Sequence, residues 1–203
     1  LGNTLQEQQL TEEALRLAKR YSEKQAIVNS LYARSRQNTS LENYNSAIED
    51  LRFALDIYDE AQNQFQHWYL LPKSFIQSEI SNVFFSMGDY EDALHFSEAA
   101  YKDTSFFGKI KSTVTINLAL IHIALNDKTK VLYYLNLAEN FSKDLDISSE
   151  RDAANQYALL AIIHLYVGDY DIAEQLAHSS IALFIKYQEP LYVMRIKRTL
   201  AKV

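Results

Sequence analysis

The chain of 203 residues contains two stretches with nearly the same order of apolar and polar positions. Residues 87–101 read MGDYEDALHFSEAAY, and residues 167–181 read VGDYDIAEQLAHSSI. In both, a Gly-Asp-Tyr triplet is followed by small or apolar residues at offsets of three and four, which places these residues on one side of a helix. The pattern therefore predicts an amphipathic helix after each triplet, with Gly88 or Gly168 in the preceding turn.

Related patterns elsewhere predict more turns of the same kind. Asn126-Asp127 lies midway between the two glycines, and Asn tolerates the left-handed backbone conformation that such a turn needs. Turns are expected near residues 9, 42, 88, 126 and 168, each with an apolar helix before it and an amphipathic helix after it. The segment 36–43, RQNTSLEN, is expected to form a longer loop, and Glu12-Glu13 to begin a helix.

Small or apolar residues recur at matching positions in three of the predicted second helices. They are Ala93, Ser97 and Ala100, then Val131, Leu135 and Ala138, then Ala173, Ala177 and Ser180. Small side chains at these positions let the two helices of a hairpin approach closely. One hairpin cannot bury its own apolar face, so the hairpins are expected to stack. With Gly 4 and Pro 2, the chain also has too few turn residues for an all-β fold.

The hairpin pattern resembles the tetratricopeptide repeat (TPR) family. One unit matches the family pattern at Ser81, Phe84, Gly88-Asp89-Tyr90, Ala93 and Ala100, and another at Ala161, Gly168-Asp169-Tyr170 and Ala173. The resemblance implies an all-α fold, a right-handed superhelical solenoid of antiparallel helix hairpins whose concave surface is lined by the first helices. The units mostly exceed the usual period of about 34 residues, and in this they resemble the units of bacterial regulatory TPR proteins.

The repeats are expected to form a single TPR-like array over residues 1–203. Its units lie at approximately 23–72, 73–110, 111–152 and 153–189, with partial units at both ends. Because the first residue is Leu1, and because the pattern begins in a second helix and stops within a repeat, we interpret the chain as a fragment of a larger multidomain protein.

The sequence offers little for catalysis. It has no cysteine and no glycine-rich phosphate loop. His122 and His164 occupy the position that Phe84 holds in its own unit, so we interpret them as packing residues rather than as metal ligands. We therefore expect no enzymatic activity, no cofactor and no metal. The net charge of −6 disfavours nucleic acid as a partner of this region, and no apolar run reaches the roughly 20 residues of a membrane span.

The TPR resemblance implies a peptide-binding concave groove formed by the first helices. The candidate ligand-binding residues at groove positions are Phe75, Glu79, Asn82, Thr113, Asn117, Asn155 and Tyr166. A carboxamide in each of three units is notable, because it both donates hydrogen bonds to a peptide backbone and accepts them from it. The competing explanation is that these three Asn side chains form hydrogen bonds to nearby helices or to water.

The expected function is non-catalytic binding of a protein or peptide, as the sensory or regulatory part of a bacterial signalling protein. The alternative is a self-association scaffold that dimerises an attached output domain. The cytoplasm is the expected compartment, with a periplasmic sensor domain as the other possibility.

Overall fold

The computed structural model describes residues 2–61, 72–103, 109–143 and 150–200. All regular elements in these ranges are α-helices, as the sequence predicts. The chain divides into two compact units, Leu1–Phe106 and Phe107–Val203. The helices are α1 (Gly2–Arg20), α2 (Lys24–Ser40), α3 (Tyr44–Ala61), α4 (Lys73–Met87), α5 (Tyr90–Lys102), α6 (Lys109–Ala124), α7 (Lys128–Lys143), α8 (Glu150–Val167), α9 (Tyr170–Lys186) and α10 (Pro190–Leu200).

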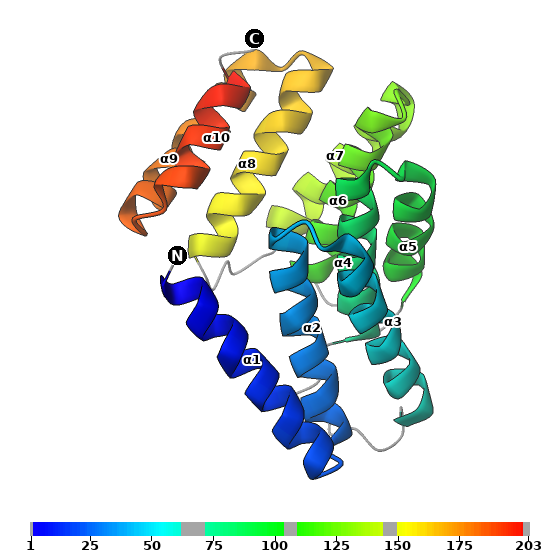
Figure 1. The fold of residues 1–203 in the computed structure, drawn as a ribbon. Helices are drawn as coiled ribbons and strands as arrows, with labels where there is room; N and C mark the ends of the chain where they lie inside the picture. The colour runs from blue at the N-terminus through cyan, green and yellow to red at the C-terminus, as the bar shows by residue number, and fades with distance from the viewer. Residues whose placement is uncertain (1, 62–71, 104–108, 144–149, 201–203) are drawn as a thin grey trace. The chain divides into compact units, whose positions relative to one another are not determined.

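Each unit is built from antiparallel helix hairpins (Figure 1). In the first unit, α2 pairs with α3 and α4 pairs with α5, while α1 packs on α2 and α3 packs on α4. In the second unit, α6 pairs with α7 and α8 pairs with α9, both α6 and α7 contact α8, and α10 packs on α9. Helices that follow one another in sequence therefore lie side by side, which is the arrangement expected of stacked repeats.

The same turn joins consecutive helices at six places in the described chain. In each turn one residue has a positive φ angle, and the next backbone N–H donates to a carbonyl five residues earlier, as in a Schellman motif. The positive-φ residues are Ser22, Glu42, Gly88, Asn126, Gly168 and Gln188. The corresponding bonds, of 2.8–3.0 Å, run from Glu23 to Ala18, Asn43 to Asn38, Asp89 to Phe84, Asp127 to His122, Asp169 to His164 and Glu189 to Phe184.

Three expectations for the first part of the chain are wrong. Residue 9 lies inside α1, and the turn that follows this helix is at Ser22. Residues 36–40 continue α2, so the expected long loop is a short turn at residues 41–43. Glu12 and Glu13 lie in the middle of α1, where Glu13 forms an ion pair with Arg16. These expectations fail because polar residues do not by themselves end a helix: Glu12 and Glu13 are exposed within α1, and Gln37 and Asn38 are half-buried within α2.

The recurrent small residues of the second helices lie in the cores of the hairpins. All nine positions are buried, from Ala93 in α5 to Ser180 in α9. Two buried hydroxyls also join the helices directly: Ser81 Oγ donates to the Ala93 carbonyl at 2.7 Å, and Ser180 Oγ donates to the Ala154 carbonyl at 2.6 Å. Such bonds require close approach of the two backbones, which small side chains permit.

The tyrosines that follow the two glycine turns differ in their surroundings. The ring of Tyr90 packs against Phe85, with the ring centroids 5.5 Å apart. Tyr170 is 60% exposed, so most of its ring faces solvent. The glycines themselves have φ angles of 84° (Gly88) and 102° (Gly168), a region that side chains with a Cβ rarely adopt.

Candidate functional site

In the first unit, a cluster of polar side chains lies between the first helices α2 and α4. Glu79 and Asn82 are one helical turn apart on α4, and Asn82 Nδ2 donates to Glu79 Oε2 at 3.4 Å. Tyr32 and Arg36 lie one turn apart on α2; the Arg36 charge acts on Glu79, and the Glu79 charge acts on Tyr32. These four residues are called the α2–α4 cluster below.

Burial sets the protonation of this cluster. It raises the pKa of the Glu79 carboxyl above its ordinary value, while the Arg36 charge and the Asn82 hydrogen bond oppose that shift. Burial and the negative charge of Glu79 raise the pKa of Tyr32 to about 12, with Arg36 acting in the opposite direction. The Tyr32 phenol is therefore neutral at physiological pH, and it offers both a hydroxyl donor and an acceptor.

The cluster combines predicted residues with residues that sequence reasoning missed. Glu79 and Asn82 were candidate groove residues, and Phe75 lies one turn before Glu79 on the same helix, half-buried. Tyr32 and Arg36 were missed because the region 23–42 fitted the repeat pattern poorly. Their spacing of four residues, on a helix equivalent to α4, was the signal that could have identified them.

In the second unit, the candidate residues occupy different environments. Asn117 of α6 is 8% exposed, so it is a buried polar residue, and Thr113, one turn earlier, is half-buried. Asn155 of α8 is exposed. The Tyr166 hydroxyl donates to Asn126 Oδ1 at 3.1 Å, which ties the end of α8 to the turn between α6 and α7. Of these four side chains, only that of Asn155 is exposed.

Asn155 lies at a cavity in the second unit between α8, α9 and α10. The cavity has a volume of about 320 Å³. It is lined by Asn155, Ala158, Leu159, Ala161, Ile162 and Leu165 of α8, Ala177 and Phe184 of α9, and Tyr192 and Ile196 of α10. The rings of Phe184 and Tyr192 are stacked, with their centroids 4.8 Å apart. The lining is apolar apart from the Asn155 carboxamide and the Tyr192 hydroxyl, and it is called the α8–α10 cavity below.

The two histidines at the Phe84 position are both buried but have different neighbours. The ring of His122 stacks on Tyr134 at a centroid distance of 5.5 Å, much as Phe84 stacks on Phe96. His164 is 2% exposed, and its Nε2 lies 3.2 Å from Glu139 Oε1 and its Nδ1 3.3 Å from Asp169 Oδ2. Because the two carboxylates approach opposite edges of the ring, they do not converge on one metal ion.

A second cavity, of about 450 Å³, lies in the first unit between α1, α2 and α3. Its centre is an ion-pair network in which Arg34 donates to both oxygens of Asp50, at 2.9 and 2.6 Å. Arg34 also donates to Glu12 at 3.1 and 3.2 Å. The hydrogen bonds to Asp50, followed by those to Glu12, raise the pKa of Arg34 above its ordinary value. The network joins three helices, and its charged groups are already paired within the chain.

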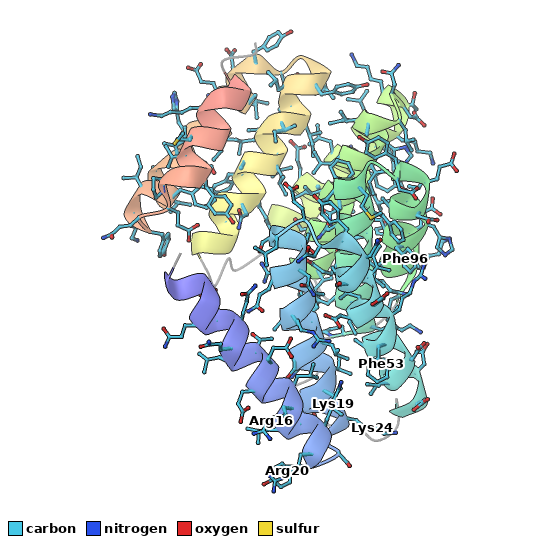
Figure 2. All side chains as sticks on the ribbon, in the orientation of Figure 1. Arg16, Lys19, Arg20, Lys24, Phe53 and Phe96 are labelled. Carbon is cyan, nitrogen blue, oxygen red and sulfur yellow. The ribbon has the colours of Figure 1, made fainter. Side chains whose placement is uncertain are left out.

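Basic side chains gather where α1 meets α2. Figure 2 shows Arg16, Lys19, Arg20 and Lys24 at this corner, with Phe53 of α3 beside Lys19. Lys19 Nζ lies 5.8 Å from the centre of the Phe53 ring, a cation–π contact. Lys19 and Arg20 are in the last turn of α1, where positive charge stabilises the helix dipole. Stabilisation of the helix dipole therefore accounts for the positions of Lys19 and Arg20.

The described residues contain no group of three or more His, Cys, Asp or Glu side chains placed to hold a metal ion. None of the described helices combines the length and the apolar character that a membrane crossing requires.

Comparison with known proteins identifies the fold. No family model matches the chain, and no curated protein matches its sequence. Among solved structures, BtubC (BKLC) from P. vanneervenii has a TM-score of 0.66 at 21% identity, covering 97% of this chain and 80% of that one. A kinesin light chain from Podosopora anserina, described as having nearly identical TPR-like repeats, has a TM-score of 0.59 at 17% identity, covering 92% of this chain and 90% of that one.

The chain therefore has the fold of the TPR-like solenoids, an all-α stack of antiparallel helix hairpins, as the sequence resemblance predicts. Solenoids of this kind present extended surfaces that they use for binding.

Proposed function

We propose that the chain binds an extended segment of a protein or peptide without catalysis, as the sensory or regulatory part of a bacterial signalling protein. The α2–α4 cluster carries the proposal, because it places a carboxylate, a carboxamide, a phenol and a guanidinium between two first helices. An extended backbone has unpaired N–H and C=O groups, and this set contains both donors and acceptors for them. The length of the repeat units supports the bacterial regulatory setting.

The experiment begins with random peptides displayed on phage and selected on the immobilised chain. Affinities of the selected peptides are then measured by fluorescence anisotropy for the wild type and for Asn82→Ala. Loss of one hydrogen bond of about 1 kcal/mol predicts binding that is weaker by roughly fivefold. Asn45→Ala is the matched control, because Asn45 is an exposed carboxamide on α3.

Circular dichroism shows whether each variant keeps the helicity of the wild type. If the peptides bind Asn82→Ala as tightly as the wild type, the α2–α4 cluster is not the binding surface. If selection yields no specific peptide at all, the proposed function itself is wrong.

Self-association remains a second candidate because one observation favours it. Leu10 and Leu17 of α1, and Tyr21 directly after its last residue, are spaced by seven and four residues and are 64%, 38% and 66% exposed. They lie on one side of the helix as an apolar stripe, which a second copy of the chain would cover. Analytical ultracentrifugation tests this: a dimer that Leu10→Ser and Leu17→Ser dissociate supports self-association, and a monomer at all concentrations refutes it.

A further inference from the structure

The α8–α10 cavity owes its volume to small side chains. Ala158 and Ala161 of α8 and Ala177 of α9 line it, and each leaves space that a larger residue would fill. Leu159 and Ile162 of α8 also line the cavity, and both are partly exposed although they are apolar. On the opposite side, the stacked rings of Phe184 and Tyr192 hold α10 against α9. The cavity is therefore bounded on one side by an apolar stripe of α8 and on the other by an aromatic wall.

The volume limits what the cavity accepts. An apolar cavity of about 150 Å³ binds benzene, and pockets for small molecules begin at about 300 Å³. At about 320 Å³ the α8–α10 cavity accommodates one bulky aromatic or branched side chain together with part of its backbone. It is too small for several large residues at once.

The chemistry of the lining limits the occupant further. None of the described residues that line the cavity is charged, so a Lys, Arg, Asp or Glu side chain would lose its hydration without gaining an ion pair. Asn155 lies among the lining residues and is exposed, so its carboxamide is available to a peptide group at the edge of the cavity. The occupant that fits has an apolar body and an amide beside it.

We propose that the α8–α10 cavity is an anchor site for one bulky, uncharged side chain, preferably aromatic, of a bound protein segment, and that Asn155 pairs with the backbone next to that side chain. This inference rests on the proposed function and adds to it the class of residue that the partner must carry.

N-acetyl-tryptophanamide is a suitable probe, because it has an indole ring flanked by two amide groups. The methyl signals of Ile162 and Ile196 in a ¹H–¹³C NMR spectrum report on the cavity. We expect both signals to shift in a saturable way with this probe, and to stay unchanged with N-acetyl-glycinamide and N-acetyl-lysinamide. If the tryptophan probe shifts neither signal, the inference is wrong.

Two variants separate occupation of the cavity from binding elsewhere. Ala158→Phe places a ring inside the cavity, so it should weaken probe binding at least tenfold, whereas Ala182→Phe, on an exposed part of α9, should leave binding unchanged. Asn155→Ala should weaken binding by about fivefold through the lost hydrogen bond. Unchanged affinity in both Ala158→Phe and Asn155→Ala would overturn the inference. Asn155→Ala also keeps the test valid if Ala158→Phe does not fold.

The same spectra distinguish a second copy of the chain as the occupant. In that case the methyl signals of Ile162 and Ile196 shift with protein concentration in the absence of probe, and this outcome overturns the anchor site. Failure of the anchor site also differs from failure of the proposed function. Phage-selected peptides that depend on Asn82 but need no bulky uncharged residue would retain the function and reject the cavity as its anchor.

Discussion

Replacing Arg34 tests the ion-pair network that joins α1, α2 and α3. Arg34→Ala removes two hydrogen bonds to Asp50, of 2.9 and 2.6 Å, and leaves a carboxylate whose side chain is only 9% exposed. Asn38 remains as a donor to Asp50, but at 3.4 Å, so it compensates weakly. The variant therefore creates a nearly buried negative charge without its main partner.

The size of the effect follows from the exposure of the two partners. Breaking a fully buried ion pair costs about 3–5 kcal/mol, whereas exposed pairs contribute about 0–1 kcal/mol. The Arg34 side chain is 27% exposed, so water reaches part of the network. We therefore expect Arg34→Ala to lower the free energy of unfolding by about 2–3 kcal/mol, between the two limits.

Urea unfolding followed by circular dichroism measures this loss, with two variants as controls. Arg16→Ala breaks the ion pair with Glu13, in which both side chains are more than half exposed, and should leave the urea midpoint unchanged. Asp50→Ala should cost less than Arg34→Ala, because the freed guanidinium can still reach Glu12 and solvent. If Arg34→Ala is as mild as Arg16→Ala, the network does not stabilise the first unit and this reasoning is wrong.

Three further predictions concern single residues. Gly88→Ala should destabilise the chain by about 1 kcal/mol in thermal melts because of its φ of 84° alone, since no atom lies within 4 Å of the added Cβ. Glu79→Gln should raise the urea midpoint at pH 7 and change little at pH 4. The reason is that a folded-state pKa raised by burial makes the ionised carboxyl cost stability once the pH exceeds its ordinary value of 4.5. Ser81→Ala should cost about 1 kcal/mol in urea unfolding, because it removes the buried hydrogen bond to the Ala93 carbonyl, whereas Ser86→Ala, at an exposed position, should cost less.

The turns show which structural features the sequence makes predictable. Gly88, Gly168 and Asn126 could be identified because glycine and asparagine are the residues that most readily adopt a positive φ. Ser22, Glu42 and Gln188 adopt the same conformation with residue types that give no such signal. Of these three, only the turn near residue 42 is among the turns expected from the repeat spacing, while Ser22 and Gln188 lie beside the expected unit boundaries at residues 23 and 189. Repeat spacing therefore places a turn approximately, but it does not identify the residue that adopts the positive φ.

The candidate site was less predictable than the fold, because its residues depend on which side chains of different helices meet. The position of Glu79 and Asn82 on one face of α4 follows from helical spacing. That Tyr32 and Arg36 of α2 lie close to Glu79 depends on how two hairpins stack, which a single helix pattern does not encode. The α8–α10 cavity was missed for the same reason, since three separate helices form it.

The three equivalent positions at residues 84, 122 and 164 show the limit of repeat-based inference. The repeat pattern correctly identifies a ring at each position, and all three rings are buried. Phe84 and His122 each stack on an aromatic ring, so their surroundings are alike. His164 lies between Glu139 of α7 and Asp169 of the turn instead. His122 also has a turn carboxylate, with its Nδ1 3.9 Å from Asp127 Oδ2, but its other neighbour is the Tyr134 ring. A repeat therefore specifies the position and the approximate volume of a side chain, while its polar partners depend on residues that the repeat leaves free to vary.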